Sequence, residues 1–530
     1  MLSPVMPLVR KYQPAITLCL LLLISWVLSA TTQSTSIAAL WPAFVALATI
    51  IASRQAVAGL FAGALSGCLF LTHGNLGQSF ISLTESHFFA SMQGSWRIGA
   101  ILFTLVLGSF AMVLEKGGGF ESLALRLLEK KSGNPSRKLE GTTMLMGLLC
   151  FFDGLANSLL LGKVTQPLAD RVGVPRARMA YLVDSTSSSV ACVAFISTWI
   201  ATQLSLIQQS TEGTAVTESA YTLFFQSIPA NYYCTFTLIL LALVIWRQWN
   251  IGPMKNAAAN EPATSHQSSQ TGSSIHTAII PIIVLACAIL SLFYLWETSP
   301  LFPVTADKLT TAFSSNAAPY ALTLGSVIGL AAACILFPNK SKIELPSIVS
   351  QGASSMLSPL LILIMAWTFG SVMKELGTAQ WLADTIGSTF SVQYFPAAIF
   401  ITGALVSFTT GSSWGTMALL MPIAIPAYLT LTPESYPLLP AVIGAVFSGA
   451  VFGDHCSPFS DTTIVSSFAC GVSPREHVLT QLPYALIAAG TALALGYTGI
   501  AIGFSSYTAL LAGAAFLIIL VNFCSKKRSS

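Results

Sequence analysis

Four aspartates interrupt segments that are otherwise apolar enough to cross a membrane: Asp153, Asp184, Asp454 and Asp461. The remaining sixteen of the twenty acidic residues fall in expected loops or at expected helix ends. An aspartate at the centre of a spanning helix costs about 2.5 to 3.5 kcal/mol on insertion scales, so four of them indicate a function. Asp153 has an alternative role as the N-cap of a helix.

Hydroxyl and amide side chains surround these aspartates. Carboxylate, hydroxyl and carbonyl oxygens are the ligands that a hard cation prefers, whereas thiolate or imidazole clusters favour transition metals. The candidate residues for binding an ion or substrate are Asp153, Asn157, Ser158, Asp184, Ser185, Thr186, Ser187, Thr409, Thr410, Ser412, Ser413, Asp454, Ser457, Asp461 and Thr462. The candidates for proton coupling are Asp454, Asp461, Asp184 and His455. The alternatives are that the hydroxyls only satisfy backbone groups or permit close packing, and that the histidine only forms hydrogen bonds.

Two pairs of short apolar stretches flank a polar tip, at about residues 140–168 and 393–430. Each arm holds about 12 to 14 residues, which is too short to cross a bilayer of about 30 Å. We therefore expect two re-entrant helical hairpins whose tips are buried in protein or face water.

Two longer helices, at about 178–208 and 438–470, are expected to be interrupted halfway. The first interruption is predicted at Asp184–Ser189 and the second within residues 453–463, where Pro458 removes a backbone donor. Unwound backbone at the bilayer midplane is a common construction of ion sites in transporters.

These elements belong to a chain of 530 residues of which 54% are hydrophobic and 8% are charged. Ordinary soluble domains have about 25% charged residues, so the composition excludes a soluble protein. We count about twelve apolar runs of spanning length and predict an all-α polytopic membrane protein. Cysteines and histidines show no metal-binding spacing, and we expect no cofactor and no metal other than Na⁺.

The basic residues indicate how the chain crosses the membrane. Most of them, from Arg10 and Arg54 to the basic tail, fall in loops on one side, which is the cytoplasmic side under the positive-inside rule. Arg97, Lys308 and Lys374 fall outside. Both termini are thus expected in the cytoplasm, and the scattered charge gives no reason to expect a nucleic-acid partner.

The two halves of the chain resemble each other at a separation of about 260 residues. The stretch from Phe103 resembles the one from Leu361, and the region around Asp184 resembles that around Asp454. The charge count gives the copies opposite orientations, as in many transporters. The expected organisation is an N-terminal anchor helix (1–35), a first repeat (36–247), a cytoplasmic linker (248–275), a second repeat (276–502) and a C-terminal helix with a basic tail (503–530).

The stretch GDHCSPFSDTTIVSSFACGVSPREHVLTQLPYAL from Gly453 resembles the signature of the NhaC family of Na⁺/H⁺ antiporters. FFDGLANSLLLG, RARMAYLVDSTSSSVACVAFISTWI and TTGSSWGTMALLMPIAIP are similar to the family pattern as well. Gly154 and Leu155 depart from it, because the family commonly has an aromatic residue and an alanine after the first aspartate. The resemblance covers roughly residues 95–210 and 350–490.

This resemblance implies a homodimer in the bacterial inner membrane with an elevator-like transport domain. It also implies that the hairpin tips at Asp153–Ser158 and Thr409–Ser413 and the broken helices at Asp184–Ser188 and Asp454–Thr463 form the site. The family includes exchangers of organic acids and proteins associated with drug export, so it specifies the fold more closely than the substrate.

The function that these residues favour is exchange of Na⁺ for H⁺ by alternating access. A buried carboxylate is costly when charged, so a proton or a sodium ion must neutralise it before it moves through the membrane. The first alternative is a Na⁺- or H⁺-coupled transporter of a small organic substrate such as a carboxylate, an amino acid or a drug. An ion channel is a weaker alternative, and no enzyme motif lies at membrane depth.

Overall fold

The computed structural model describes residues 5–526, apart from 33, 130–133, 258–273, 339–343, 387–390 and most of 298–316. Most of the predicted linker and the basic tail lie outside the described residues. The helices of the first half are α1 (Val5–Thr31), α2 (Thr35–Ser53), α3 (Ala56–Leu71), α4 (Leu76–Ile81), α5 (Ser95–Lys116), α6 (Gly119–Glu129), α7 (Pro135–Leu149), α8 (Gly154–Val172), α9 (Arg176–Val193), α10 (Thr198–Thr211), α11 (Ala220–Ser227) and α12 (Tyr232–Arg247). Those of the second half are α13 (His276–Glu297), α15 (Ala318–Leu336), α16 (Leu345–Ser355), α17 (Leu357–Glu375), α18 (Thr378–Ile386), α19 (Phe395–Thr410), α20 (Ser413–Leu431), α21 (Leu439–Cys456), α22 (Asp461–Cys470), α23 (Pro474–Thr491), α24 (Thr498–Ala501) and α25 (Ser506–Lys526).

The described part of the chain contains helices and no strands. Twelve helical stretches within it are long and apolar enough to cross a membrane. Only helices and closed barrels satisfy their backbone hydrogen bonds inside lipid, so apolar stretches of this length are expected to form helices. The prediction of an all-α polytopic membrane protein is confirmed.

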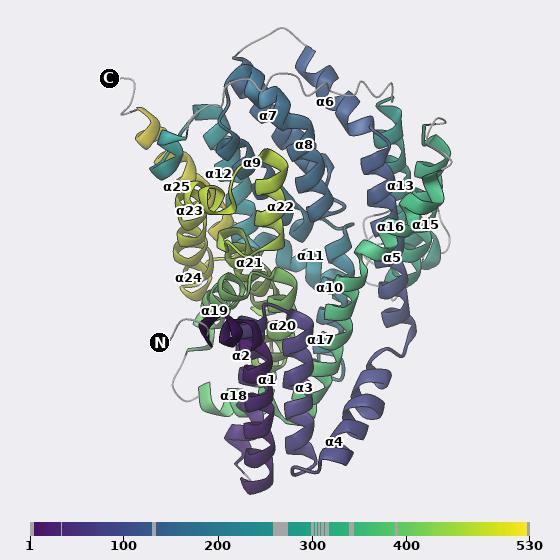
Figure 1. Cartoon of the computed structure of the whole chain (residues 1–530), viewed down its shortest axis with the longest axis vertical. Helices are drawn as coiled ribbons and strands as arrows, with labels where there is room; N and C mark the ends of the chain where they lie inside the picture. Colours follow the sequence, from purple (N-terminus) through teal and green to yellow (C-terminus); the bar gives the residue numbers. More distant parts are fainter. Residues whose placement is uncertain are drawn as a thin grey trace.

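The second half of the chain repeats the order of elements of the first. A long helix, a short helix, a helix pair and a divided helix follow one another as α5, α6, α7–α8 and α9–α10, and again as α17, α18, α19–α20 and α21–α22. In Figure 1, α5 leads to α6 near the top of the molecule, whereas α17 leads to α18 near the bottom. The long helices therefore run in opposite directions, as the inverted repeat predicts, and the equivalence of the halves stays a prediction.

The helix pairs differ from the expected short arms. The arms have 15 and 19 residues in α7 and α8, and 16 and 19 residues in α19 and α20. The prediction of 12 to 14 residues was wrong because helices extend into polar residues beyond the apolar runs: α7 begins at Pro135, and α8 continues to Val172. Because α19 and α20 are parts of stretches that are each long enough to cross, re-entry stays a prediction.

Helices α9 and α21 pack inside the molecule: in Figure 1, α9 lies between α8 and α12, and α21 lies below it, next to α19 and α20. In α21, 89% of the most apolar stretch is buried within the chain. All residues of α9 from Ala177 to Cys192 are buried. The two helices that carry Asp184 and Asp454 are thus surrounded by protein.

Small residues bring α19 and α21 into direct contact. A side chain at Gly449 would place its Cβ 2.6 Å from the carbonyl oxygen of Phe400 and 3.0 Å from the amide nitrogen of Ala404. Backbone atoms cannot move aside as a flexible side chain does, so the two helices lie as close as glycine permits.

We therefore predict that Gly449→Ala lowers stability by about 1 to 3 kcal/mol, the usual cost of overpacking. Gly490→Ala is the matched control, because Gly490 lies in α23 and a Cβ atom at this position would meet open space. Thermal unfolding of the purified protein in detergent measures both. Equal melting temperatures for the two variants would contradict the tight contact.

Candidate functional site

Asp454 lies in the last turn of α21, beside the interruption that separates this helix from α22. Residues 457–460 form the interruption and include Pro458. The Asp454 side chain accepts hydrogen bonds from the hydroxyls of Ser460 (2.6 Å to Oδ1) and Thr462 (3.1 Å to Oδ2). The hydroxyl of Ser188 in α9 lies 3.5 Å from Oδ2. A carboxylate that is only 2% exposed is therefore surrounded by hydroxyl groups from both halves of the chain.

Asp184 lies near the middle of α9 and is fully buried. Its Oδ2 accepts a hydrogen bond from the side-chain amide of Gln481 (2.8 Å) and lies 3.2 Å from Nε2 of His477. The Ser466 hydroxyl in α22 lies 3.3 Å from Oδ1, within donating distance, and 3.0 Å from the hydroxyl of Ser158. The neighbours of Asp184 are thus nitrogen groups of α23 and, at 3.7 Å, Nε2 of His455 on one oxygen, and a hydroxyl on the other.

His455 connects the surroundings of the two carboxylates. Its Nδ1 lies 2.6 Å from the Tyr233 hydroxyl of α12, and its Nε2 lies 3.3 Å from the Ser185 hydroxyl of α9. The amide of Gln481 donates to the His455 carbonyl over 2.5 Å while it also contacts Asp184. A continuous set of hydrogen bonds therefore joins α9, α12, α21 and α23 around the buried acids.

The predicted interruption of the first long helix at Asp184–Ser189 is wrong. Helix α9 continues from Arg176 to Val193, and the chain leaves the helix only at residues 194–197, where α10 begins at an angle of 42°. Most hydroxyls of this stretch do not compete for the backbone of α9 in a way that breaks it, because they bond within the helix or to neighbours, whereas the Ser189 hydroxyl has no partner among the described residues. Thr186 donates to the Leu182 carbonyl, and Ser187 donates to the Gly154 carbonyl.

In the first helix pair, the side chains of Asp153 and Asn157 form hydrogen bonds with backbone groups. Asp153 caps α8 through Ala156 (2.7 Å), and its other oxygen accepts from Thr198 at the start of α10. Asn157 donates to the carbonyls of Gly147 and Thr186. Its Oδ1 is buried and has no hydrogen-bond partner among the described residues. The Asn157 oxygen is therefore available to a ligand that donates a hydrogen bond or is a cation.

The tip of the second helix pair packs against the interruption after α21, because a Cβ atom at Gly411 would lie 2.9 Å from the Phe459 carbonyl oxygen and 3.1 Å from the Ser460 amide nitrogen. Thr409 is exposed and bonds within α19, and Thr410 is buried. Ser412 caps α20 through the amide of Gly415, followed by the buried Ser413. Two other candidates are placed by the interruption after α21: Ser457 is buried within it, whereas Asp461, the first residue of α22, is exposed. Of the four predicted aspartates, Asp184 and Asp454 lie buried on α9 and α21, and each carboxylate has its own set of side-chain partners.

His477, Gln481 and Tyr233 were missed as site residues. His477 and Gln481 are four residues apart on α23, so they lie on one helix face. Two polar side chains at this spacing in an apolar helix are the signal that would have found them. Tyr233 stands among apolar residues of α12 with no such signal.

A cation bonded only to oxygen suits Asp454 better than Asp184. Hydroxyl groups can turn their lone pairs toward a sodium ion, whereas the amide and imidazole N–H groups at Asp184 cannot act as ligands. Among the described residues, no group of three or more His, Cys, Asp and Glu side chains forms a metal site. A carboxylate among hydroxyls can accept either a proton or a cation.

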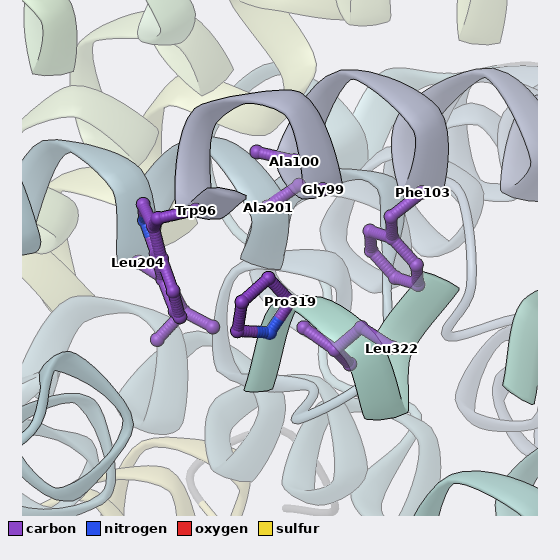
Figure 2. A pocket seen from close by; sticks show the side chains of 8 residues that line it. All are labelled: Trp96, Gly99, Ala100, Phe103, Ala201, Leu204, Pro319 and Leu322. Atoms are coloured by element: carbon purple, nitrogen blue, oxygen red, sulfur yellow. The ribbon is translucent and has the colours of Figure 1, made fainter. Parts of the chain in front are cut away.

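The small pocket in Figure 2 lies away from these groups. Its lining residues are apolar and come from α5, α10 and α15: Trp96, Gly99, Ala100, Phe103, Ala201, Leu204, Pro319 and Leu322. A volume of about 10 Å³ holds at most about one water molecule. We interpret it as a packing gap.

Arg54 contacts the interruption between α21 and α22 from outside the network. It ends α2 in the left-handed conformation (φ 57°), and its guanidinium lies 3.4 Å from the centroid of the Phe459 ring. Within the described residues it forms no ion pair. The positive charge of Arg54 thus lies over the ring of Phe459. The next residue in the chain is Ser460, which donates a hydrogen bond to Asp454.

Residues 190–500 match the model of the Na⁺/H⁺ antiporter family. The match covers more than half of the chain. The chain belongs to this family. The matched region includes the helices that carry Asp454, His477 and Gln481. The resemblance to NhaC-type antiporters is therefore confirmed, and the chain is a transporter rather than an enzyme.

An uncharacterised protein of Haemophilus influenzae is 30% identical over 93% of this chain and 96% of its own length. The malate-2H⁺/Na⁺-lactate antiporter of Bacillus subtilis is 34% identical, and the similarity covers 26% of this chain and 29% of that protein. Among solved structures, the YdaH transporter of Alcanivorax borkumensis aligns over 86% of this chain and 90% of its own, with a TM-score of 0.58 and 17% identity. This structural likeness supports the fold alone.

The contact of Arg54 with Phe459 leads to a prediction about cation affinity. Removing a nearby positive charge reduces the repulsion of a cation, so Arg54→Gln is expected to lower the apparent KM for Na⁺ by about threefold or more. Arg54→Lys keeps the charge and is the control. Na⁺-dependent transport in proteoliposomes measures the KM of both variants. An unchanged or raised KM in the Gln variant would contradict the idea that the Arg54 charge repels the transported cation.

Proposed function

We propose that this protein exchanges Na⁺ for H⁺ across the membrane, with the two ions alternating at the carboxylate of Asp454. The observation that carries the proposal is the set of three hydroxyls, from Ser188, Ser460 and Thr462, around a side chain that is 2% exposed. Oxygen ligands of this kind bind a hard cation without the multiple charges that would hold it permanently.

Burial supplies the coupling. An isolated charged carboxylate is strongly disfavoured in an apolar environment, so the site carries either a proton or a sodium ion while it moves. The empty charged site is too costly to cross the membrane. Exchange then follows without a separate gate, because each ion must leave before the other neutralises the same carboxylate.

Asp184 has a different part in this mechanism. Its oxygens are occupied by N–H and O–H donors from α22 and α23, which stabilise its charged form and fix its orientation. We propose that it positions α9, and with it Ser188, against Asp454. His455 is the further candidate for proton coupling because its ring, on α21 of the second half, contacts Ser185 and Tyr233 of the first half.

The movement that exposes the site to either side is proposed to be elevator-like. Support comes from the opposite directions of α5 and α17 and from the site at the meeting point of elements from both halves. A homodimer in the bacterial inner membrane with cytoplasmic termini is part of the same proposal and derives from the family resemblance.

The second candidate function is exchange that includes a small organic acid. The relative from Bacillus subtilis bears the name malate-2H⁺/Na⁺-lactate antiporter, and it shares about a quarter of this chain. A strict need for a third solute, besides Na⁺ and a pH gradient, would favour this candidate.

The test is Asp454→Asn, which keeps the shape of the side chain and removes its charge. In proteoliposomes, Na⁺ addition is expected to move protons through the wild type, and the variant is expected to lose this activity by about a hundredfold or more. Asp384→Asn, at an exposed position of α18, is the control. If the Asp454 variant is folded and exchanges Na⁺ for H⁺ at the wild-type rate, the proposal is wrong.

A further inference from the structure

A second, larger cavity lies at the other end of α10 from the acids. Its volume is about 290 Å³, close to the lower limit of about 300 Å³ for ligand pockets. It is lined by residues at the start of α5, the end of α10, the end of α17, the start of α18 and the middle of α20. The positive-inside rule predicts that this end of the molecule lies outside the cell.

Two positive charges and one negative charge line the cavity. Arg97 lies 3.5 Å from Oε2 of Glu212, and Lys374 donates to the Glu212 backbone carbonyl over 2.8 Å. The Glu212 side chain is 62% exposed, so its ion pair with Arg97 is weak. Within the described residues, Lys374 forms no ion pair with a carboxylate. A ligand carboxylate can therefore replace Glu212 at Arg97 and pair with Lys374 as well.

Gln209 adds an unsatisfied hydrogen-bond acceptor to the lining. Its amide nitrogen donates to the carbonyl of Trp367 over 2.6 Å, which fixes the orientation of the side chain. Its Oε1 is buried and has no hydrogen-bond partner among the described residues. An acceptor of this kind favours a ligand that carries an O–H or N–H group.

The wall that carries Arg97 is held firmly. The Arg97 guanidinium donates to the carbonyl of Ala90 over 3.3 Å, and its neighbour Trp96 lies with Leu204 and Pro319 in the apolar gap of Figure 2. The guanidinium is therefore positioned before a ligand arrives, which lowers the entropy that binding must offset.

Two helices connect this cavity with the acids. Helix α10 begins at Thr198, which bonds Asp153, and ends at the cavity about 20 Å away. Helix α20 runs beside it, and the Trp199 and Trp414 rings of the two helices pack with their centroids 5.4 Å apart. Packed helices thus connect the wall of the cavity with the tip of the first helix pair.

We propose that the Arg97, Lys374 and Gln209 cavity is an external binding site for a small organic carboxylate that carries an O–H or N–H donor, that is, a hydroxy acid or an amino acid. The proposal deepens the proposed function, on which it rests, by naming the substrate class that accompanies Na⁺ and H⁺. The net positive lining has the wrong sign to attract Na⁺ and the right sign to attract a carboxylate.

Three acids with the same three-carbon skeleton test the ligand chemistry: lactate has a hydroxyl, alanine has an ammonium group, and propionate has neither. Binding to the purified full chain is measured by calorimetry, with all three as sodium salts or in equal sodium chloride. We expect lactate or alanine to bind at least about tenfold more tightly than propionate, and which of the two binds identifies the donor.

Variants test the residues. Arg97→Gln and Lys374→Gln are each expected to weaken binding about tenfold, whereas Glu212→Gln is expected to tighten it because a competing carboxylate is removed. Lys255→Gln, which removes an exposed cation after α12, is the control and should bind as the wild type does. A purely structural role of Glu212 would not produce tighter binding.

The proposal is overturned if none of the three acids binds the wild type, if propionate binds as tightly as the others, or if the Arg97 and Lys374 variants bind normally. Na⁺-driven proton movement without any organic acid is measured on the same preparations. Loss of that activity in the wild type would contradict Na⁺/H⁺ exchange and leave the binding result standing, so the two failures are distinguishable.

Discussion

The cost of burying a carboxylate in an apolar interior governs the whole arrangement around Asp184 and Asp454. Each unpaired charge there would destabilise the fold by several kcal/mol. The chain meets this constraint by directing polar groups from several helices toward two side chains. The surrounding helices must therefore be positioned so that these polar groups reach the carboxylates. Gln481, for example, can donate to Asp184 only because α23 packs beside α9.

The two acids satisfy the same constraint in different ways. Asp184 accepts from an amide and lies beside an imidazole, so its charge is balanced by groups that belong to the protein. Asp454 accepts from hydroxyls, which carry no charge and offer oxygen as readily as hydrogen. One carboxylate is therefore suited to hold the structure together, and the other is suited to exchange its neutralising ion.

Much of this site was accessible from the sequence because its signals are local. Pro458 and the hydroxyls around it marked the second interruption, and an aspartate in an apolar run is conspicuous by itself. The first interruption was misplaced because hydroxyl-rich residues within α9 form hydrogen bonds that only the tertiary structure reveals. The position of Asp461 at the surface depends on how α22 is rotated, and Tyr233 joins the site through a contact over more than two hundred residues.

The close contact of Gly449 with Phe400 and Ala404 also limits how the molecule can change shape. Two helices whose backbones touch cannot slide along each other without large clashes, because neither surface has side chains that yield. Any displacement that carries Asp454 toward one side of the membrane must take α19 along with α21. In the proposed elevator-like movement, the first arm of the second helix pair would therefore travel with Asp454 and not remain with the frame.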